Sequence, residues 1–278
     1  MSNPKIWLVT GASSGFGRAI TTAAIEAGDT VIAVARRTAA LDDLVAAHPD
    51  RIEALALDVT DTARIDTVIA DIVARYGRID VLVNNAGRTQ VGAAEETTDG
   101  ELRDLFDLHF FGPAALTRAV LPQMRAQGSG AIVMMSSVGG QLSFAGFSAY
   151  SATKFALEGY SEALAEEVAP FGIRVLVVEP GAFRTGLFGA GAAYFSTENA
   201  VYDETAGATR RMVENGDGTQ PGDPAKAAAA IRTALEADRT PLHLPLGEDA
   251  VDGVLNHLDA VRDEVTEWEK ITRATAFD

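Results

Sequence analysis

Residues 149–159 of the sequence, "AYSATKFALEG", place a phenol and an amine four positions apart in a stretch that is otherwise rich in Ala. On a helix, residues i and i+4 share a face, so Tyr150 and Lys154 can address one point in space. A phenol with an ordinary pKa near 10 becomes a base at neutral pH only if that pKa falls by about 3, which needs roughly 4 kcal/mol of phenolate stabilisation. The ammonium group of Lys154 is a candidate for supplying it. Taken alone, the pair is more simply explained as a surface lysine whose stem packs along a tyrosine, so other segments must decide.

A glycine-rich segment near the N-terminus, "VTGASSGFGRAI" at residues 9–20, predicts a phosphate-binding turn. Gly11 permits the tight turn. Gly15 and Gly17 let a pyrophosphate approach the backbone, where the following helix offers free N–H groups and the positive end of its dipole. An ordinary strand-to-helix loop is the alternative, but the apolar run before the segment and the helical pattern after it favour a dinucleotide site.

The end of the second apolar run indicates which dinucleotide would bind. An NAD site would have a carboxylate here to hold the ribose hydroxyls, whereas this chain reads "VIAVARRTAA", with Arg36 and Arg37. An arginine fork suits the 2′-phosphate of NADP by charge and by bidentate geometry. The alternative is a solvated basic pair at a helix start, which would face the unfavourable end of that helix dipole. We therefore expect NADP.

The composition excludes several other classes of function. The chain has 278 residues and a formal net charge of −16, with neither sign gathered into a tail, so we expect no binding to nucleic acid or to a membrane. It has no cysteine and its four histidines show no metal-ligand spacing, so we expect neither disulfides nor a metal site. The apolar run at residues 6–12 is too short for a signal-peptide core, and no stretch approaches the roughly 18 apolar residues of a transmembrane helix. These observations predict a soluble, cytoplasmic protein.

Short apolar runs alternate with longer amphipathic stretches from the N-terminus to Pro180. The predicted strands are residues 6–9, 30–35, 52–59, 81–85, 131–137 and 174–180, and the predicted helices are residues 15–27, 39–47, 61–76, 101–127 and 149–168. Strict alternation indicates right-handed crossovers and one parallel sheet that is covered on both faces. This is the doubly wound α/β class (Rossmann fold), whose ligands lie beyond the carboxyl ends of the strands. Because no break in composition separates two cores, residues 1–278 are predicted to form a single domain.

The pattern stops after Pro180 for about forty residues rich in glycine and aromatic side chains, a length that is usually functional or disordered. We therefore predict a mobile substrate flap over about residues 182–222, with a short helix near residues 201–213. The remaining predicted elements are a helix over residues 224–236, a short strand over residues 241–247 and a C-terminal helix over about residues 250–273.

Six motifs of this chain resemble, in order and in spacing, those of the short-chain dehydrogenase/reductase family. They are "TGASSGFG" (10–17), "LDV" (57–59), "NNAG" (84–87), "SS" (136–137), "YSATK" (150–154) and "PGAFRT" (180–185). The resemblance covers about residues 4–185, and the region beyond varies within that family. It implies an NADP-dependent carbonyl reductase or alcohol dehydrogenase that acts on a small-molecule ketone, aldehyde or alcohol.

The resemblance also implies where NADP would bind. Asp58 would hold the adenine, residues 85–87 would line the adenosine ribose, and Ser13 and Arg36 would share the 2′-phosphate. Thr185, with the backbone near it, would fix the nicotinamide carboxamide. The predicted cofactor-binding residues are Gly11, Ser13, Ser14, Gly15, Phe16, Gly17, Arg36, Arg37, Asp58, Val59, Asn85, Ala86, Gly87, Tyr150, Lys154, Pro180, Gly181, Phe183 and Thr185.

The predicted catalytic residues are Ser137, Tyr150, Lys154 and His109. As the resemblance implies, Ser137 would hydrogen-bond the substrate oxygen, Tyr150 would transfer the proton, and Lys154 would serve both the phenol and the nicotinamide ribose. His109 stands where the family usually has an Asn that holds a relay water. An imidazole titrates near pH 6.5, so His109 would add an inflection between about pH 6 and 7, unless it only packs and bonds the backbone.

Aromatic and apolar residues near Tyr150 and in the flap favour an apolar or aromatic substrate, although the same side chains could seal the core. They are Leu142, Phe144, Phe147, Phe183, Leu187, Phe188, Tyr194, Phe195, Tyr202 and Met212. Arg184, Arg210 and Arg211 could meet a substrate carboxylate, but solvent exposure is the simpler expectation.

Two other functions stay open on the sequence alone. One is a catalytically silent NADP-binding sensor or scaffold, and the other is a dehydratase or epimerase on the same fold. Four aromatic side chains on the long helices, together with the family resemblance, predict a homo-oligomer, either a dimer or a tetramer. These side chains are Phe110, Phe111, Phe155 and Tyr160.

Overall fold

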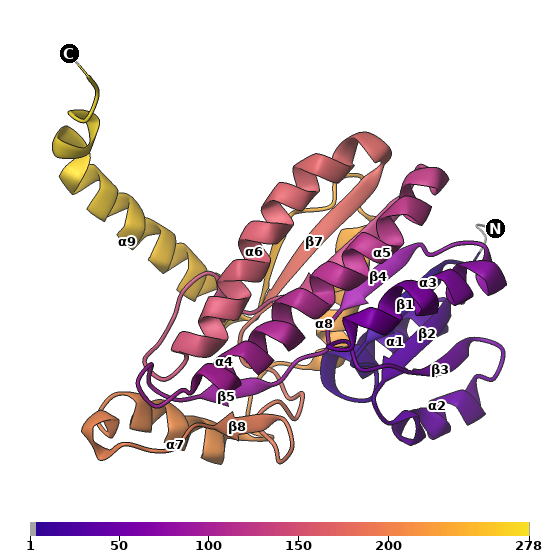
Figure 1. Ribbon diagram of the computed structural model, residues 1–278, viewed down its shortest axis with the longest axis horizontal. Coiled ribbons are helices and arrows are strands. Elements are labelled where there is room, and N and C mark those ends of the chain that lie inside the picture. The colour runs from indigo at the N-terminus through magenta and orange to yellow at the C-terminus, as the bar shows by residue number, and fades with distance from the viewer. Residues whose placement is uncertain (1–3, 278) are drawn as a thin grey trace.

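The computed structural model describes residues 4–277 and is built on a seven-stranded parallel sheet (Figure 1). The strand order is β3-β2-β1-β4-β6-β7-β9. The bounds are Ile6–Thr10 for β1, Thr30–Ala35 for β2, Ile52–Ala56 for β3, Val81–Asn84 for β4, Gly130–Met135 for β6, Ile173–Pro180 for β7 and His243–Leu246 for β9. The strand order reverses between β1 and β4, which confirms the predicted doubly wound α/β fold.

Alternate residues of each strand face opposite helical layers. In β1, Trp7 and Val9 belong to one buried cluster, whereas Leu8 belongs to the other. Helices α1 (Gly15–Glu26), α2 (Asp42–Ala47) and α8 (Pro224–Glu236) cover the first face, and α3 (Thr62–Tyr76), α5 (Gly112–Gln127) and α6 (Ser148–Val168) cover the second. Because both faces are buried, the strands read as continuous apolar runs in the sequence.

The long helix predicted over residues 101–127 is interrupted by a π-helical turn. The three pieces are α4 (Asp99–Phe106), the π-helical turn Asp107–Phe111 and α5. A capping box of Thr98 and Glu101 starts α4 earlier than predicted. At Gly112 a Cβ atom would lie 2.7 Å from the carbonyl oxygen of Val59, so only glycine allows this close approach to the loop after β3. The turn buries His109, and such turns often occur at functional sites.

The region after Pro180 contains structure that the sequence did not predict. The strand β8 (Ala193–Phe195) pairs in parallel with β5 (Thr89–Val91), outside the main sheet. The predicted short helix is present as α7 (Ala206–Gly216), displaced toward the C-terminus. The mobility of this flap stays a prediction.

The C-terminal helix α9 (Glu248–Arg273) projects away from the rest of the protein and is drawn in yellow in Figure 1. Its first turn is tied to the loop after β7, because the carboxylate of Asp249 accepts a hydrogen bond from the backbone N–H of Ala182 at 2.8 Å. The same carboxylate closes over Gly181, where a Cβ atom would collide with it. Within residues 4–277, no helix combines the length and the hydropathy needed to span a bilayer.

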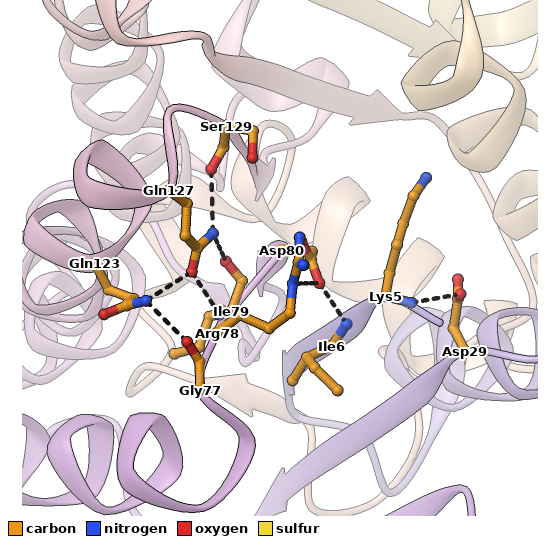
Figure 2. Close-up of polar contacts among 10 residues, drawn as sticks. All are labelled: Lys5, Ile6, Asp29, Gly77, Arg78, Ile79, Asp80, Gln123, Gln127 and Ser129. Carbon is orange, nitrogen blue, oxygen red and sulfur yellow. Dashed lines mark hydrogen bonds and ion pairs between the residues drawn. The ribbon is translucent and has the colours of Figure 1, made fainter. Parts of the chain in front are cut away.

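Polar contacts fix the amino-terminal edge of the sheet, as Figure 2 shows. Asp80 accepts a hydrogen bond from the backbone N–H of Ile6 at 2.8 Å. Gln127 bonds the backbone N–H and carbonyl of Ile79 at 3.1 and 2.9 Å, and it also donates to the carbonyl of Ser129 at 3.2 Å. These contacts join the starts of β1, β4 and β6, so this edge is held together by its own polar groups.

Candidate active site

Ser137, Tyr150 and Lys154 line one cavity beside the carboxyl edge of the sheet, with a volume of about 730 Å³. Ser137 follows the end of β6, and the other two residues lie one turn apart near the start of α6. Tyr150 is 9% exposed and Lys154 is 6% exposed. The fold therefore brings together the three residues that the sequence placed in catalysis.

Burial raises the pKa of the Tyr150 phenol above its ordinary value, and an interaction with the Ser137 hydroxyl only partly offsets the rise. Lys154 Nζ donates a hydrogen bond to the carbonyl oxygen of Met135 at 2.8 Å and lies 5.7 Å from the centre of the Tyr150 ring. Burial therefore sets the direction of the shift, and a lowering of the phenol pKa by this ammonium stays a prediction for the complex with the cofactor. In the protein alone, desolvation of the phenolate dominates and Tyr150 keeps its proton at neutral pH.

Both ring nitrogens of His109 are bonded within the protein. Nε2 accepts a hydrogen bond from the backbone N–H of Arg88 at 3.2 Å, and Nδ1 lies 2.9 Å from the hydroxyl oxygen of Thr153. Thr153 donates its own proton to the carbonyl of Tyr150 at 2.7 Å, so it must accept from a protonated Nδ1. His109 is therefore a neutral imidazole that braces the first turns of α6.

Burial lowers the pKa of His109 well below 6.5, and the nearby positive charges of Lys154 and Arg88 lower it further. For this reason we expect no inflection from His109 between pH 6 and 7. His109 lines the same cavity as Ser137, Tyr150 and Lys154, and its two bonds support a structural role, whereas its part in a proton relay stays a prediction.

We expect the pH profiles of kcat for the wild type and for His109→Asn to have the same shape between pH 6 and 7. The variant should lose about 1–3 kcal/mol of unfolding free energy, because shortening the side chain leaves buried groups without partners. Rate profiles and urea unfolding check the two statements, with His257→Asn on α9 as the matched control. An inflection that the wild type shows and only His109→Asn lacks would prove that the ring titrates there.

A second group of residues around the same cavity fits an anionic dinucleotide. Ser14 occupies the N-cap of α1 without a side-chain capping bond, so the N–H groups of the first turn are open to a phosphate in the cavity. Gly11 and Gly15 adopt φ angles of 63° and 53°, which favour glycine. Burial opposes ionisation of Asp58, but the hydrogen bonds from Thr60 and, less strongly, the charge of Arg36 bring the pKa of this carboxyl below its ordinary value.

Nearly all the predicted cofactor-binding residues line this cavity. They are Gly11, Ser13, Ser14, Gly15, Phe16, Arg36, Arg37, Asp58, Val59, Asn85, Ala86, Gly87, Tyr150, Lys154, Pro180, Gly181, Phe183 and Thr185. Gly17 does not. A Cβ atom there would lie 2.3 Å from the carbonyl oxygen of Gly11, so Gly17 lets α1 pack on the turn instead of admitting a pyrophosphate. Asn85 braces the same turn by donating to the carbonyl of Thr10 at 2.8 Å.

The substrate side of the cavity is lined by part of the flap. Of the apolar and aromatic residues considered from the sequence, Phe183, Leu187, Phe188 and Tyr194 line it. Arg184, Arg210 and Arg211 bind groups of the protein itself, namely the carbonyls of Gln220 and Ser196 and the carboxylate of Asp203. Arg88, which was not predicted from the sequence, also lines the cavity, and its guanidinium stacks 4.1 Å from the centre of the Tyr194 ring.

A buried acidic cluster behind Lys154 was also missed. Glu158 lies one turn after Lys154 on α6, and the fold brings it to Glu179 of β7 and His243 of β9. His243 Nδ1 lies 2.7 Å from Glu179 Oε1, and Gln141 donates to Glu179 at 2.9 Å. The ligand atoms of the three titratable residues lie within 4.8 Å of one another, so His243 does have metal-ligand spacing, contrary to the expectation from the sequence. Hydrogen bonds from Gln141 and His243 reach the Glu179 carboxylate, whereas Glu158 Oε1 is buried without a hydrogen-bond partner.

Burial raises the pKa of Glu158 to about 7, and the charge of Glu179 adds to the rise. The pKa of this carboxyl is higher in the folded state than in the unfolded state. Its contribution to stability is therefore fully present below the unfolded-state pKa and is lost as the pH rises through the folded-state pKa. We therefore expect the unfolding free energy of Glu158→Gln, measured relative to that of the wild type, to increase by on the order of 2–3 kcal/mol when the pH is raised from 5 to 8. Urea unfolding at both pH values measures the gain.

Glu162→Gln, one turn further along α6, is the matched control for this prediction because its side chain is 59% exposed. It should change the unfolding free energy little at either pH. Equal responses of the two variants to pH would show that Glu158 ionises as freely as a surface carboxylate.

Comparison with known proteins agrees with the fold and identifies the family. A sequence model described as short chain dehydrogenase matches residues 5–193. The chain therefore belongs to the short chain dehydrogenase family.

Individual relatives match almost the whole chain. A short-chain dehydrogenase from Streptomyces avermitilis with a known crystal structure is 72% identical, with a TM-score of 0.95 over 99% of this chain and 100% of the other. Oxidoreductase BOA17 of Botryotinia fuckeliana is 36% identical over 98% of this chain and 99% of its own. The closed form of serine dehydrogenase complexed with NADP+ is 30% identical, with a TM-score of 0.73 over 87% of this chain and 94% of the other.

Proposed function

We propose that this protein is an NADPH-dependent oxidoreductase that reduces an apolar or aromatic ketone or aldehyde to its alcohol. The observation that carries the proposal is the shared cavity of Ser137, Tyr150 and Lys154, whose wall also includes the N-terminus of α1 and Arg36. The known complex of a relative, serine dehydrogenase, with NADP+ supports the same cofactor for this chain.

The residues present fit NADPH, which supplies a hydride when it is bound. The first turn of α1 would hold the pyrophosphate, and Arg36 would hold the 2′-phosphate. Asp58 would bind the adenine, while Lys154 and Thr185 would hold the nicotinamide half. All of these residues line the cavity.

The protein's own chemistry is to polarise and protonate the carbonyl oxygen. Ser137 donates a hydrogen bond to that oxygen, and Tyr150 transfers its phenolic proton to it as the alkoxide forms. The raised pKa of Tyr150 supports the reducing direction, because the phenol enters the reaction protonated. Burial lowers the pKa of Lys154 to about 8, so its ammonium can give up a proton near neutral pH and restore the phenol.

A panel of ketones and aldehydes, assayed with NADPH and with NADH and followed by product identification, tests the proposal. We expect NADPH to be consumed with equal formation of an alcohol. A dehydratase or epimerase would form product without a net change in nicotinamide absorbance. A sensor or scaffold would bind NADPH and leave every compound of the panel unchanged.

We also propose that the protein forms a homo-oligomer through α5 and α6. Phe111, at the end of the π-helical turn, is 52% exposed, and Phe155 of α6 is 46% exposed. The ring of Phe110 packs against those of Phe111 and Tyr160, with ring centres 5.2 and 5.8 Å apart. Exposed aromatic side chains that pack on other aromatic side chains are typical of an interface in which two copies bring the same helices together.

A further inference from the structure

Helix α9 carries an exposed apolar stripe that the proposed function does not use. Its members are 38–64% exposed, and they are Val251, Leu255, Leu258, Val261, Val265, Trp268 and Ile271. Figure 1 shows that the helix leaves the body of the protein, and Ala250 alone is buried among its residues. A contiguous stripe of this kind on a soluble surface marks an interaction site.

The stripe has the spacing of a coiled coil. Val251, Leu258 and Val265 repeat every seven residues, and a second apolar residue follows each of them by three, namely Val254, Val261 and Trp268. These are the a and d positions of three heptads, which favour packing against another helix along a narrow line. We call these six side chains the α9 seam.

The α9 seam is complementary to itself when two copies run antiparallel. A twofold axis between Leu258 and Val261 sets these two residues against each other. The same axis sets Val254 against Val265 and Val251 against Trp268, so every layer from Val251 to Trp268 is apolar on both sides.

The charges beside the seam also favour the antiparallel orientation. At the flanking g positions, the antiparallel pair places His257 opposite Glu264, and at the e positions Leu255 lies opposite the stem of Arg262. A parallel pair would instead place His257 opposite Arg262 and Glu264 opposite Glu269, whereas in the antiparallel pair Glu269 lies opposite Glu248 at the end of the helix.

We propose that α9 pairs with α9 of a second copy of this chain as an antiparallel two-helix coiled coil. An anionic membrane is the other possible occupant of such a stripe, but the flanks of α9 are rich in Asp and Glu, and basic flanks are what anionic lipid selects. The second copy is the occupant that fits the self-complementary seam.

The chain has no cysteine, so introduced thiols report the pairing directly. In the antiparallel pair, residue 254 of one copy faces residue 265 of the other, whereas two copies of residue 265 lie far apart. Under mild oxidation, Val254→Cys/Val265→Cys should form a disulfide-linked dimer on a non-reducing gel, and each single variant should stay monomeric on that gel. Cross-linking of Val265→Cys alone would show a parallel pair and overturn the proposal, as would no cross-linking of the double variant.

A second variant separates pairing through the seam from accidental collision. Val261→Glu, added to the cysteine pair, places two carboxylates in the central layers and should reduce the cross-linking rate at least 10-fold. Ala260→Glu, on the opposite side of the helix, is the matched control and should leave the rate unchanged. Equal rates for the two, or sedimentation of the wild type with anionic phosphatidylserine vesicles, would overturn the proposal.

Discussion

Tyr150→Phe is expected to lower kcat about 100- to 10,000-fold, because it removes the proton donor from the carbonyl oxygen. NADPH affinity and the folded structure should stay close to those of the wild type. The ring itself is kept, with its packing against His109 at 5.6 Å and Phe147 at 5.7 Å between ring centres. The loss should therefore fall on the chemical step alone.

Single-turnover rates and a fluorescence titration with NADPH measure the two effects separately. Tyr160→Phe is the matched control, since it removes a phenol from the same helix outside the residues that line the cavity. Near-normal turnover by Tyr150→Phe would remove Tyr150 from the reaction.

Arg36→Asp should lower the ratio of catalytic efficiencies with NADPH and NADH by roughly 10- to 150-fold, which corresponds to losing a charge-assisted contact of about 1.5–3 kcal/mol. Arg36 is exposed to solvent, so we expect the lower part of this range. The introduced carboxylate would repel the 2′-phosphate of NADPH and could accept hydrogen bonds from the ribose hydroxyls of NADH.

Arg64→Asp makes the same change of charge on the exposed side of α3 and is the matched control. It should leave the ratio unchanged. If Arg36→Asp gives the same ratio as this control, the preference for NADPH must come from other residues.

The features that depend on residues close together in the sequence could be predicted. Tyr150 and Lys154 share a helix face by spacing alone, and Ser137 follows a buried strand, so their positions at the carboxyl edge could be predicted. The alternation of apolar runs and helices likewise predicted the parallel sheet.

The features that the sequence did not predict depend on tertiary contacts. Glu158, Glu179 and His243 come from three different elements and meet only when β7 and β9 pair. The π-helical turn depends on the close approach of Gly112 to Val59, which no local period encodes. β5 and β8 have three residues each, too few for a period-2 pattern.

His109 shows how burial can reverse an interpretation that rests on residue type. An imidazole has an ordinary pKa near 6.5 and therefore suggests a titrating group. The fold places it where desolvation and two cations oppose protonation. Its chemistry is decided by surroundings that lie far away in the sequence.

The hydrogen bond from Ala182 to Asp249 joins the mouth of the cavity to the base of α9. Gly181 and Ala182 line the cavity, so a ligand that orders them also orders the first turn of the C-terminal helix. Because thermodynamic linkage is reciprocal, pairing of α9 with a second copy would raise the ligand affinity by the same factor by which the ligand raises the pairing affinity. An oxidoreductase built in this way would bind its nucleotide more tightly when it is concentrated than when it is dilute.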